Sequence, residues 1–299
     1  MSAAIPRRQI DELEARWQYA KIYTVLVEGE FDQRFLRLIQ NEEYCIAWLR
    51  ELDCLDVGLV DVPPELLAAR GLNSDGAKQR VVALGREIEY RGAEEGFRGI
   101  VDVDLDVALN LDFQSTCVLY TDHSCLDAYL WTVEVLKRLI VQFKCEEKVA
   151  TKSARRALFD DINMICRGLT AVRIVQAQHA ELGLEVLYSD ASLTMVNGRI
   201  ALNLPKYVEQ CRPRKGTLNE ARRLVLEARD AISEFADLDI INGHDLVWFL
   251  AWALKKLTGG KKLTISEDAV SQSLVGFGVM DKTILEKPLF RNLGQWCGA

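Results

Sequence analysis

Acidic residues that follow two apolar, strand-like stretches are the part of this sequence best suited to chemistry. Glu28 ends the first apolar run and is followed by Gly29, which permits a tight turn close to a ligand. In the second stretch, Asp102, Asp104 and Asp106 alternate with apolar residues. Because residues two apart on a strand share a face, we expect these aspartates to point the same way for as long as the strand continues.

Such a group of carboxylates predicts a bound divalent cation. Three or four carboxylates gathered in one place repel one another unless a cation neutralises them. Oxygen ligands without histidine or cysteine select Mg²⁺ (or Mn²⁺) over zinc. An ion of this kind can activate a water molecule and stabilise the charge that develops on a phosphodiester during cleavage.

Each acidic motif also has a structural interpretation. A glutamate after a strand can favour the start of the next helix, since carboxylates are stabilised at helix N-termini. An aspartate-rich strand end can be a solvated turn. The occurrence of both motifs on strand ends, in this order, favours the metal site over these alternatives.

Neighbouring parallel strands are needed to bring the two motifs together, and the hydrophobic pattern predicts them. A helix is expected over residues 7–21, followed by a buried strand and a further helix. The same alternation recurs along the chain. The further strands are expected at residues 54–62, 99–104 and 116–120, and the further helices over 77–88 and, as one long helix, over 126–140. The pattern predicts an α/β fold with a parallel sheet flanked by helices, and ligands collect at the carboxyl ends of such strands.

The pattern changes after about residue 145, where helical stripes dominate. They cover residues 218–235 and 246–257. An exception is the stretch 193–202, in which Asn197-Gly198 indicates a β-hairpin. We therefore expect a catalytic domain over residues 1–145. A mainly helical domain with a hairpin should follow over 146–299 and serve partner binding, substrate binding or dimerisation.

Composition narrows the class of protein. The eight cysteines form no C-x-x-C pair, which favours buried thiols over a zinc site or a disulfide framework. No apolar run reaches the length that crosses a bilayer, and the N-terminus lacks a signal-peptide core, so a cytoplasmic protein is expected. The net charge of -7 argues against nucleic-acid binding only weakly, because an acidic metal site lowers the total.

The two acidic motifs, Val-Glu-Gly-Glu-Phe-Asp and Asp-x-Asp-x-Asp, resemble those of the TOPRIM domain shared by topoisomerases, bacterial primases and OLD-family nucleases. The resemblance implies that Glu28 is a metal ligand or general base. It implies that Asp102 and Asp104 hold Mg²⁺. Asp106 stands where a third acidic ligand often occurs, and Asp32 matches an auxiliary metal position of the OLD branch.

Two further segments, residues 120–130 and 240–246, resemble a small TOPRIM branch that includes the AriB-type effector of the PARIS anti-phage system. Asp122, His123 and Asp127 of the first segment are candidate accessory residues. That branch more often has Glu-Asn where this chain has Asp127-Ala128. His123 could contact a substrate phosphate, and a hydrogen bond at the start of a helix is its structural alternative.

The resemblance implies a toxin-like nuclease that an ABC-type ATPase partner holds inactive and releases on infection. Effectors of this kind are thought to dimerise when active and to cleave host tRNA. The chain itself contains no G-x-x-x-x-G-K-[ST] motif for ATP. Two other classes stay open: a non-catalytic TOPRIM-derived module that binds an ATPase or nucleic acid, and a primase-like nucleotidyl transferase.

Overall fold

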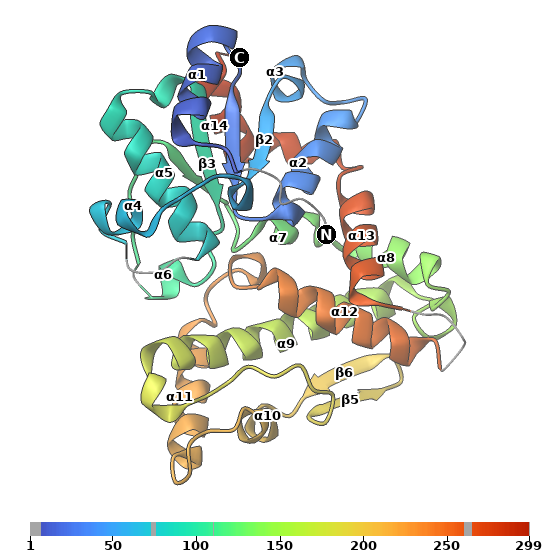
Figure 1. Cartoon of the computed structure of the whole chain (residues 1–299). Helices are drawn as coiled ribbons and strands as arrows, with labels where there is room; N and C mark the ends of the chain where they lie inside the picture. The colour runs from blue at the N-terminus through green and yellow to red at the C-terminus, as the bar shows by residue number, and fades with distance from the viewer. Residues whose placement is uncertain (1–6, 73–75, 110, 260–264, 299) are drawn as a thin grey trace, which may run out of the picture. The chain divides into compact units, whose positions relative to one another are not determined.

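The chain folds into two compact units, each described here by itself. The computed structural model describes residues 7–72, 76–109, 111–259 and 265–298 (Figure 1). The first unit comprises Met1–Val103, Asp112–Asp122 and Val279–Ala299, and the second comprises Asp104–Leu111 and His123–Gly278. These bounds differ from the division expected after residue 145, because the C-terminal stretch belongs to the first unit. The functions expected of the two parts stay predictions.

The first unit contains a four-stranded parallel sheet in the order β2-β1-β3-β4. Its strands are β1 (Thr24–Val27), β2 (Asp53–Asp56), β3 (Phe97–Val101) and β4 (Val118–Tyr120). The α-helices of this unit are α1 (Ile10–Ala20), α2 (Glu30–Asn41), α3 (Ala47–Arg50), α4 (Pro64–Ala69), α5 (Ala77–Arg91) and α14 (Pro288–Trp296). The predicted α/β class, with a parallel sheet flanked by helices, is confirmed.

The sheet is buried because its central strand is apolar along its whole length. Val25, Leu26 and Val27 are fully buried, as expected for a strand covered on both faces. Helix α5 packs closely against β3, and Gly99 permits the approach, since a Cβ there would lie 2.6 Å from Val81. The helical stripe predicted over residues 77–88 is therefore the buried face of α5.

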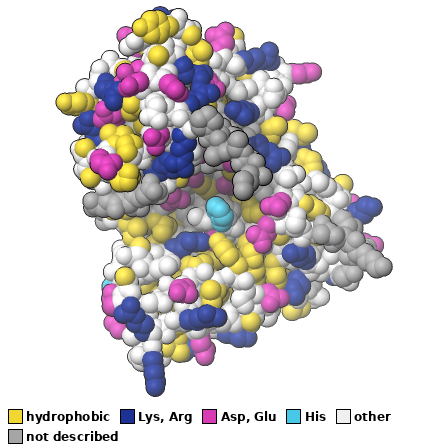
Figure 2. Space-filling view, in the orientation of Figure 1, with side chains coloured by type: hydrophobic (Ala, Val, Ile, Leu, Met, Phe, Trp, Pro, Cys, Tyr) yellow, Lys and Arg dark blue, Asp and Glu magenta, His cyan; other side chains and the backbone are white. Residues whose placement is uncertain are grey.

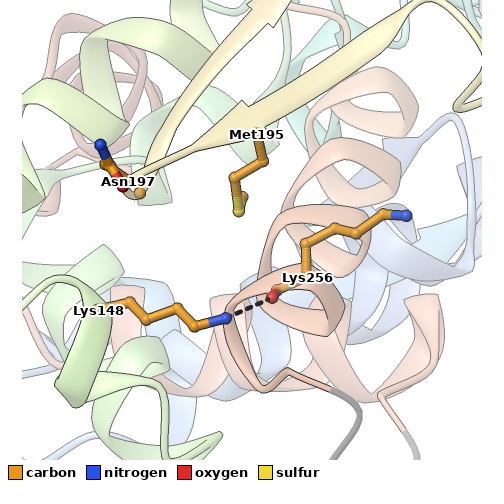
Figure 3. Close-up of a pocket in the computed structure, with 5 residues that line it drawn as sticks. Lys148, Met195, Asn197 and Lys256 are labelled. Atoms are coloured by element: carbon orange, nitrogen blue, oxygen red, sulfur yellow. Dashed lines mark hydrogen bonds between the residues drawn. The ribbon is translucent and has the colours of Figure 1, made fainter.

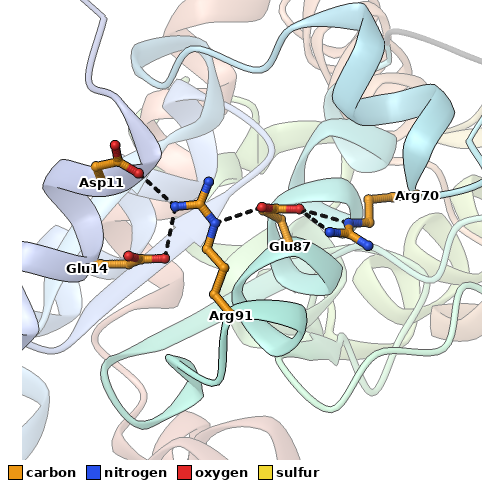
Figure 4. Close-up of polar contacts among 5 residues, drawn as sticks. All are labelled: Asp11, Glu14, Arg70, Glu87 and Arg91. Carbon is orange, nitrogen blue, oxygen red and sulfur yellow. Dashed lines mark hydrogen bonds and ion pairs between the residues drawn. The ribbon is translucent and has the colours of Figure 1, made fainter.

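A chain of alternating charges fastens α1 and α4 to α5 (Figure 4). Arg91 contacts Asp11 and Glu14 of α1 at 2.7 and 3.1 Å and contacts Glu87 at 2.7 Å. Glu87 in turn accepts a hydrogen bond of 2.8 Å from Nε of Arg70 at the end of α4. Burial raises the pKa of Glu87, but the hydrogen bonds from Arg91 and Arg70 outweigh it, so the pKa lies below its ordinary value.

Three expected elements end earlier than predicted. The strand expected over residues 54–62 stops at Asp56, whose Oδ1 accepts a 2.7 Å hydrogen bond from the Gly58 N–H and turns the chain into a 3₁₀ helix, η1 (Val57–Leu59). The strand expected to reach residue 104 stops at Val101. The single long helix expected over 126–140 is two helices, because Thr132 caps a new N-terminus there.

The second unit is mainly helical. Its strands β5 (Leu193–Val196) and β6 (Arg199–Leu202) form the predicted antiparallel hairpin. Asn197 and Gly198 have φ values of 52° and 76°, as a type I′ turn requires. The α-helices are α6 (Asp106–Leu109), α7 (Leu126–Leu130), α8 (Val133–Gln142), α9 (Lys152–Gln178), α10 (Leu204–Gln210), α11 (Leu218–Ala231), α12 (Gly243–Leu257) and α13 (Glu267–Gly278). Helix α9 packs against α8, α11, α12 and β6.

Two further expectations concern cysteines and membranes. Seven of the eight cysteines are buried, and no disulfide occurs within the described ranges, in agreement with the expectation of buried thiols. Burial raises the pKa of the Cys54 thiol to about 12. None of the helices in the described ranges is long and apolar enough to span a bilayer.

Candidate metal centre at the strand ends

The ends of β1 and β3 bring Glu28 and Asp102 together within the first unit. The two strands are parallel neighbours, with Leu26 opposite Gly99. Each acidic residue is the first one beyond its strand, so both lie at the carboxyl edge of the sheet. Oε1 of Glu28 accepts a hydrogen bond of 2.8 Å from the backbone N–H of Asp102. The two motifs paired from the sequence, 74 positions apart, are therefore in direct contact.

The chemistry of these two side chains suits a hard divalent cation. Carboxylate oxygens are the donors that Mg²⁺ and Mn²⁺ prefer, and each oxygen can take part in more than one interaction. Two neighbouring carboxylates also favour a cation over mutual repulsion. Over the described part of the chain, no group of three or more His, Cys, Asp or Glu side chains is arranged to hold a metal ion. Glu28 and Asp102 thus fit the start of a ligand set rather than a complete one.

Asp104 and Asp106 lie in a turn that belongs to the second unit. The expectation that Asp102 and Asp104 alternate along one strand is wrong, because β3 has already ended at Val101. Asp104 has a left-handed backbone with φ 49°, and its N–H donates a hydrogen bond of 2.7 Å to the Ser124 carbonyl. Asp106 is buried and begins the short helix α6. Ligand roles for both aspartates stay predictions.

Two candidate ligands of the first unit sit at helix N-termini. Oδ2 of Asp32 accepts a hydrogen bond of 3.1 Å from the N–H of Gly29, which precedes α2. Oδ2 of Asp122 accepts one of 3.1 Å from the N–H of Leu289, in the first turn of α14. Carboxylates stabilise helix N-termini, so the structural interpretation accounts for these two contacts. The auxiliary metal role of Asp32 and the accessory role of Asp122 stay predictions.

Asp127 occupies a similar position in the second unit. Its side chain lies against Gly243, the first residue of α12, where an added Cβ would be 2.7 Å from the Asp127 carboxyl carbon. The N-terminus of α12 is capped by Asn242, whose side chain accepts from two backbone N–H groups. Contact with a helix N-terminus favours a structural role for Asp127.

Three residues at the same edge of the sheet were not singled out from the sequence. Nζ of Lys78, in the first turn of α5, donates a 3.3 Å hydrogen bond to the Val103 carbonyl, next to Asp102. Thr121 is buried, and its hydroxyl accepts a hydrogen bond of 3.1 Å from the Val103 N–H, which fixes the chain as it leaves β3. Asp56 ends β2 beside β1. The sequence carries no signal for Lys78, because a lysine in a helical stretch is ordinary.

A pocket of about 570 Å³ lies away from these residues, within the second unit (Figure 3). It is lined by Lys148, Met195, Asn197, Gly198 and Lys256. Nζ of Lys148 donates to the Lys256 carbonyl at 3.2 Å, and Nζ of Lys256 pairs with Asp190 at 3.3 Å. Figure 3 shows the Lys256 side chain extending away from Lys148. Both cations already have partners, so the pocket is not a prepared anion site.

Surface charge is mixed in sign. In Figure 2, Lys and Arg side chains are interspersed with Asp and Glu side chains over the face in view. Tight phosphate binding depends on clustered basic side chains. A nucleic acid would therefore have to be held by local contacts near the chemistry rather than by a broad basic surface.

Comparison with known proteins gives no assignment: no protein-family model and no curated protein matches this chain. The likeness to TOPRIM proteins therefore rests on the acidic motifs themselves. What the structure adds is the direct contact between Glu28 and Asp102.

Proposed function

We propose that this chain is a metal-dependent nuclease of the TOPRIM type that hydrolyses phosphodiester bonds. The observation that carries the proposal is the 2.8 Å hydrogen bond between the Glu28 carboxylate and the Asp102 backbone, across the ends of adjacent strands. Carboxylates at that edge of a parallel sheet stand where ligands bind in α/β folds. Glycine at position 29 supports the same conclusion, since a Cβ there would meet no atom within 4 Å.

Each residue has a defined role in this proposal. A bound Mg²⁺ or Mn²⁺ ion would supply an activated water and charge stabilisation. Glu28 orients or deprotonates the attacking water, and Asp102 holds the metal. Asp104 and Asp106 are the expected further ligands, with Asp32 as an auxiliary one.

The biological role follows from the resemblance to the AriB-type branch. In that role the chain is a toxin-like effector of bacterial anti-phage defence, kept inactive in the cytoplasm by an ABC-type ATPase. Once released, it acts as a homodimer on host nucleic acid, with tRNA as the expected substrate. The segments 120–130 and 240–246 support this part of the proposal.

The test compares wild type, Glu28→Gln and Asp56→Asn. Asp56 is the matched control, because it ends the strand next to β1 but its carboxylate is engaged in its own turn. Purified proteins are incubated with total tRNA and Mg²⁺, with and without EDTA, and cells expressing each protein are grown with and without the ATPase. Glu28→Gln should lose cleavage by about 100-fold or more and lose toxicity, while the control keeps both. Equal cleavage by wild type and Glu28→Gln refutes the proposal.

A second candidate function is a non-catalytic module that binds a partner or nucleic acid. It is favoured by the helix-terminal positions of Asp32, Asp122 and Asp127, which give these carboxylates a structural use. Calorimetric titration with Mg²⁺ separates the two candidates. Binding that Glu28→Gln weakens supports the nuclease, whereas the same absence of heat for both proteins supports the module.

A further inference from the structure

Within the second unit, a histidine is paired with a carboxylate far away in the sequence. Nδ1 of His123 lies 3.0 Å from Oδ1 of Asp239. A carboxylate can only accept, so the bond requires a proton on Nδ1. The ring also makes an edge contact with Tyr129, with ring centroids 5.1 Å apart. Together the two contacts fix the orientation of the imidazole, as carboxylates do for catalytic histidines.

The backbone next to His123 is fixed as well. Ser124 is buried, and its N–H and hydroxyl donate to the Leu238 carbonyl at 3.1 and 2.8 Å. Its own carbonyl accepts the 2.7 Å hydrogen bond from the Asp104 N–H. The loop that carries His123 therefore also holds the acidic turn in which Asp104 lies.

A buried polar network of α9 holds the segment that presents Asp239. Arg167 donates to the Phe235 carbonyl at 2.9 Å and to Oδ1 of Asp237 at 2.7 Å. Nδ2 of Asn163 donates to Oδ2 of Asp237 at 3.0 Å. Both donors are buried, and buried polar networks of this kind impose one conformation when their hydrogen bonds are made. The segment with Asp239 is thus rigidly supported.

His179 provides a contrast. Its Nδ1 lies 3.1 Å from Glu181, a residue only two positions away at an exposed helix end. That pair needs no tertiary structure to form. The His123–Asp239 pair joins residues 116 positions apart and depends on the whole network around residues 237–241.

We propose that His123 is a catalytic residue of the nuclease, a general acid oriented by Asp239. The inference rests on the proposed function. As the water oxygen bonds to phosphorus, the bond from phosphorus to the leaving oxygen breaks, and that oxygen takes the proton from Nε2 of the His123 imidazolium. The proton of the attacking water passes to Glu28 or to solvent, and solvent reprotonates the imidazole. Asp239 is the positioning residue.

The kinetic test uses two phosphodiesters that differ in their need for an acid. Total tRNA has poor leaving groups, whereas bis(4-nitrophenyl) phosphate releases a nitrophenolate that needs no proton. His123→Gln keeps a hydrogen-bonding side chain but cannot transfer a proton. It should cleave tRNA about 100-fold more slowly. It should hydrolyse the nitrophenyl ester at close to the wild-type rate, and Asp239→Asn should change the two rates in the same direction. The control His179→Gln should leave both rates unchanged.

Glu28→Gln distinguishes failure of this inference from failure of the proposed function, because it should lose both substrates. If the wild type cleaves both through Glu28 while His123→Gln loses both equally or neither, the general acid is refuted and the nuclease stands. If the wild type cleaves neither substrate, the two proposals fall together.

A spectroscopic measurement decides the orientation without reference to rates. The chain has only three histidines, so ¹⁵N-histidine spectra can be assigned with His179→Gln and one further variant. His123 should carry a proton on Nδ1, and Asp239→Ala should abolish that preference. Its Nε2 signal should shift on addition of dimethyl phosphate. A proton on Nε2 alone, or an Nε2 signal that dimethyl phosphate does not move, overturns the assignment.

Discussion

Removal of the Asp245 carboxylate should destabilise the second unit more than the loss of an ordinary surface ion pair. Asp245 lies in the first turn of α12 and is fully buried. Arg173 of α9 grips it with two hydrogen bonds, Nη2 to Oδ1 at 2.6 Å and Nε to Oδ2 at 3.1 Å. The Tyr188 hydroxyl donates a third, of 2.8 Å. Burial lowers the pKa of Arg173, but Asp245 and Tyr188 raise it more, so the guanidinium stays charged.

The magnitude follows from what Asp245→Ala leaves behind. Breaking a buried ion pair by removing one partner costs about 3–5 kcal/mol, because the other charge stays buried without compensation. The Arg173 side chain retains 26% exposure, so water can solvate part of its charge, and the lower end of the range, about 3 kcal/mol, is expected. For a chain of this size that corresponds to a fall in Tm of about 6–12 °C.

Thermal and urea unfolding of wild type, Asp245→Ala and Tyr188→Phe would measure this. Tyr188→Phe removes one hydroxyl and leaves the ion pair, so it should cost only about 1 kcal/mol. Arg222→Ala breaks an exposed pair with Glu209 and should cost at most about 1 kcal/mol. A Tm for Asp245→Ala within 2 °C of the wild type, at an unchanged urea m-value, would show that the buried pair does not hold α12 to α9.

Three further predictions concern separate parts of the chain. Glu87→Gln should remove stability at neutral pH. Because the folded pKa of Glu87 is below its ordinary value of 4.5, this contribution is present above that pH and is lost as the pH falls through the folded pKa. The stability difference between variant and wild type should therefore shrink in urea titrations run below pH 4.5. Gly243→Ala should lower the free energy of unfolding by about 1–3 kcal/mol, since the new Cβ overlaps the Asp127 side chain. Gly276→Ala, which meets no atom within 4 Å inside α13, should leave the melting temperature unchanged or raised, and equal melting of the two variants would contradict the overlap. Lys78→Met should reduce Mg²⁺-dependent tRNA cleavage by about 10-fold or more if its ammonium, held 3.3 Å from the Val103 carbonyl, acts beside the carboxylates, and unchanged cleavage would exclude that role.

The sequence located the strands of the sheet because their apolar runs are determined locally. The contact between Glu28 and Asp102 could also be expected, since parallel strands bring their carboxyl ends to one edge. What happens just beyond a strand could not. Asp104 adopts a left-handed backbone because its N–H bonds to Ser124, 20 positions later, and no periodicity records such a bond.

Long-range pairs were equally out of reach. His123 and Asp239 each lie in a short polar stretch, and their partnership depends on the fold of α9 and the segment after α11. The break between α7 and α8 was in principle visible. Thr132 is a good capping residue, but the apolar positions on either side continue in helical register and concealed it.

The C-terminal helix gives the first unit an unusual dependence on the order of synthesis. Phe290 of α14 is fully buried with its ring 6.4 Å from that of Phe35, and Leu289 binds the Asp122 carboxylate that follows β4. These partners are the last part of the chain to leave the ribosome, long after the strands they complete. A nascent chain thus carries every acidic residue of the strand edge but lacks the helix that closes the unit. Folding of the first unit must finish after translation ends, so any harm the protein does to its own cell begins only with a released, full-length molecule.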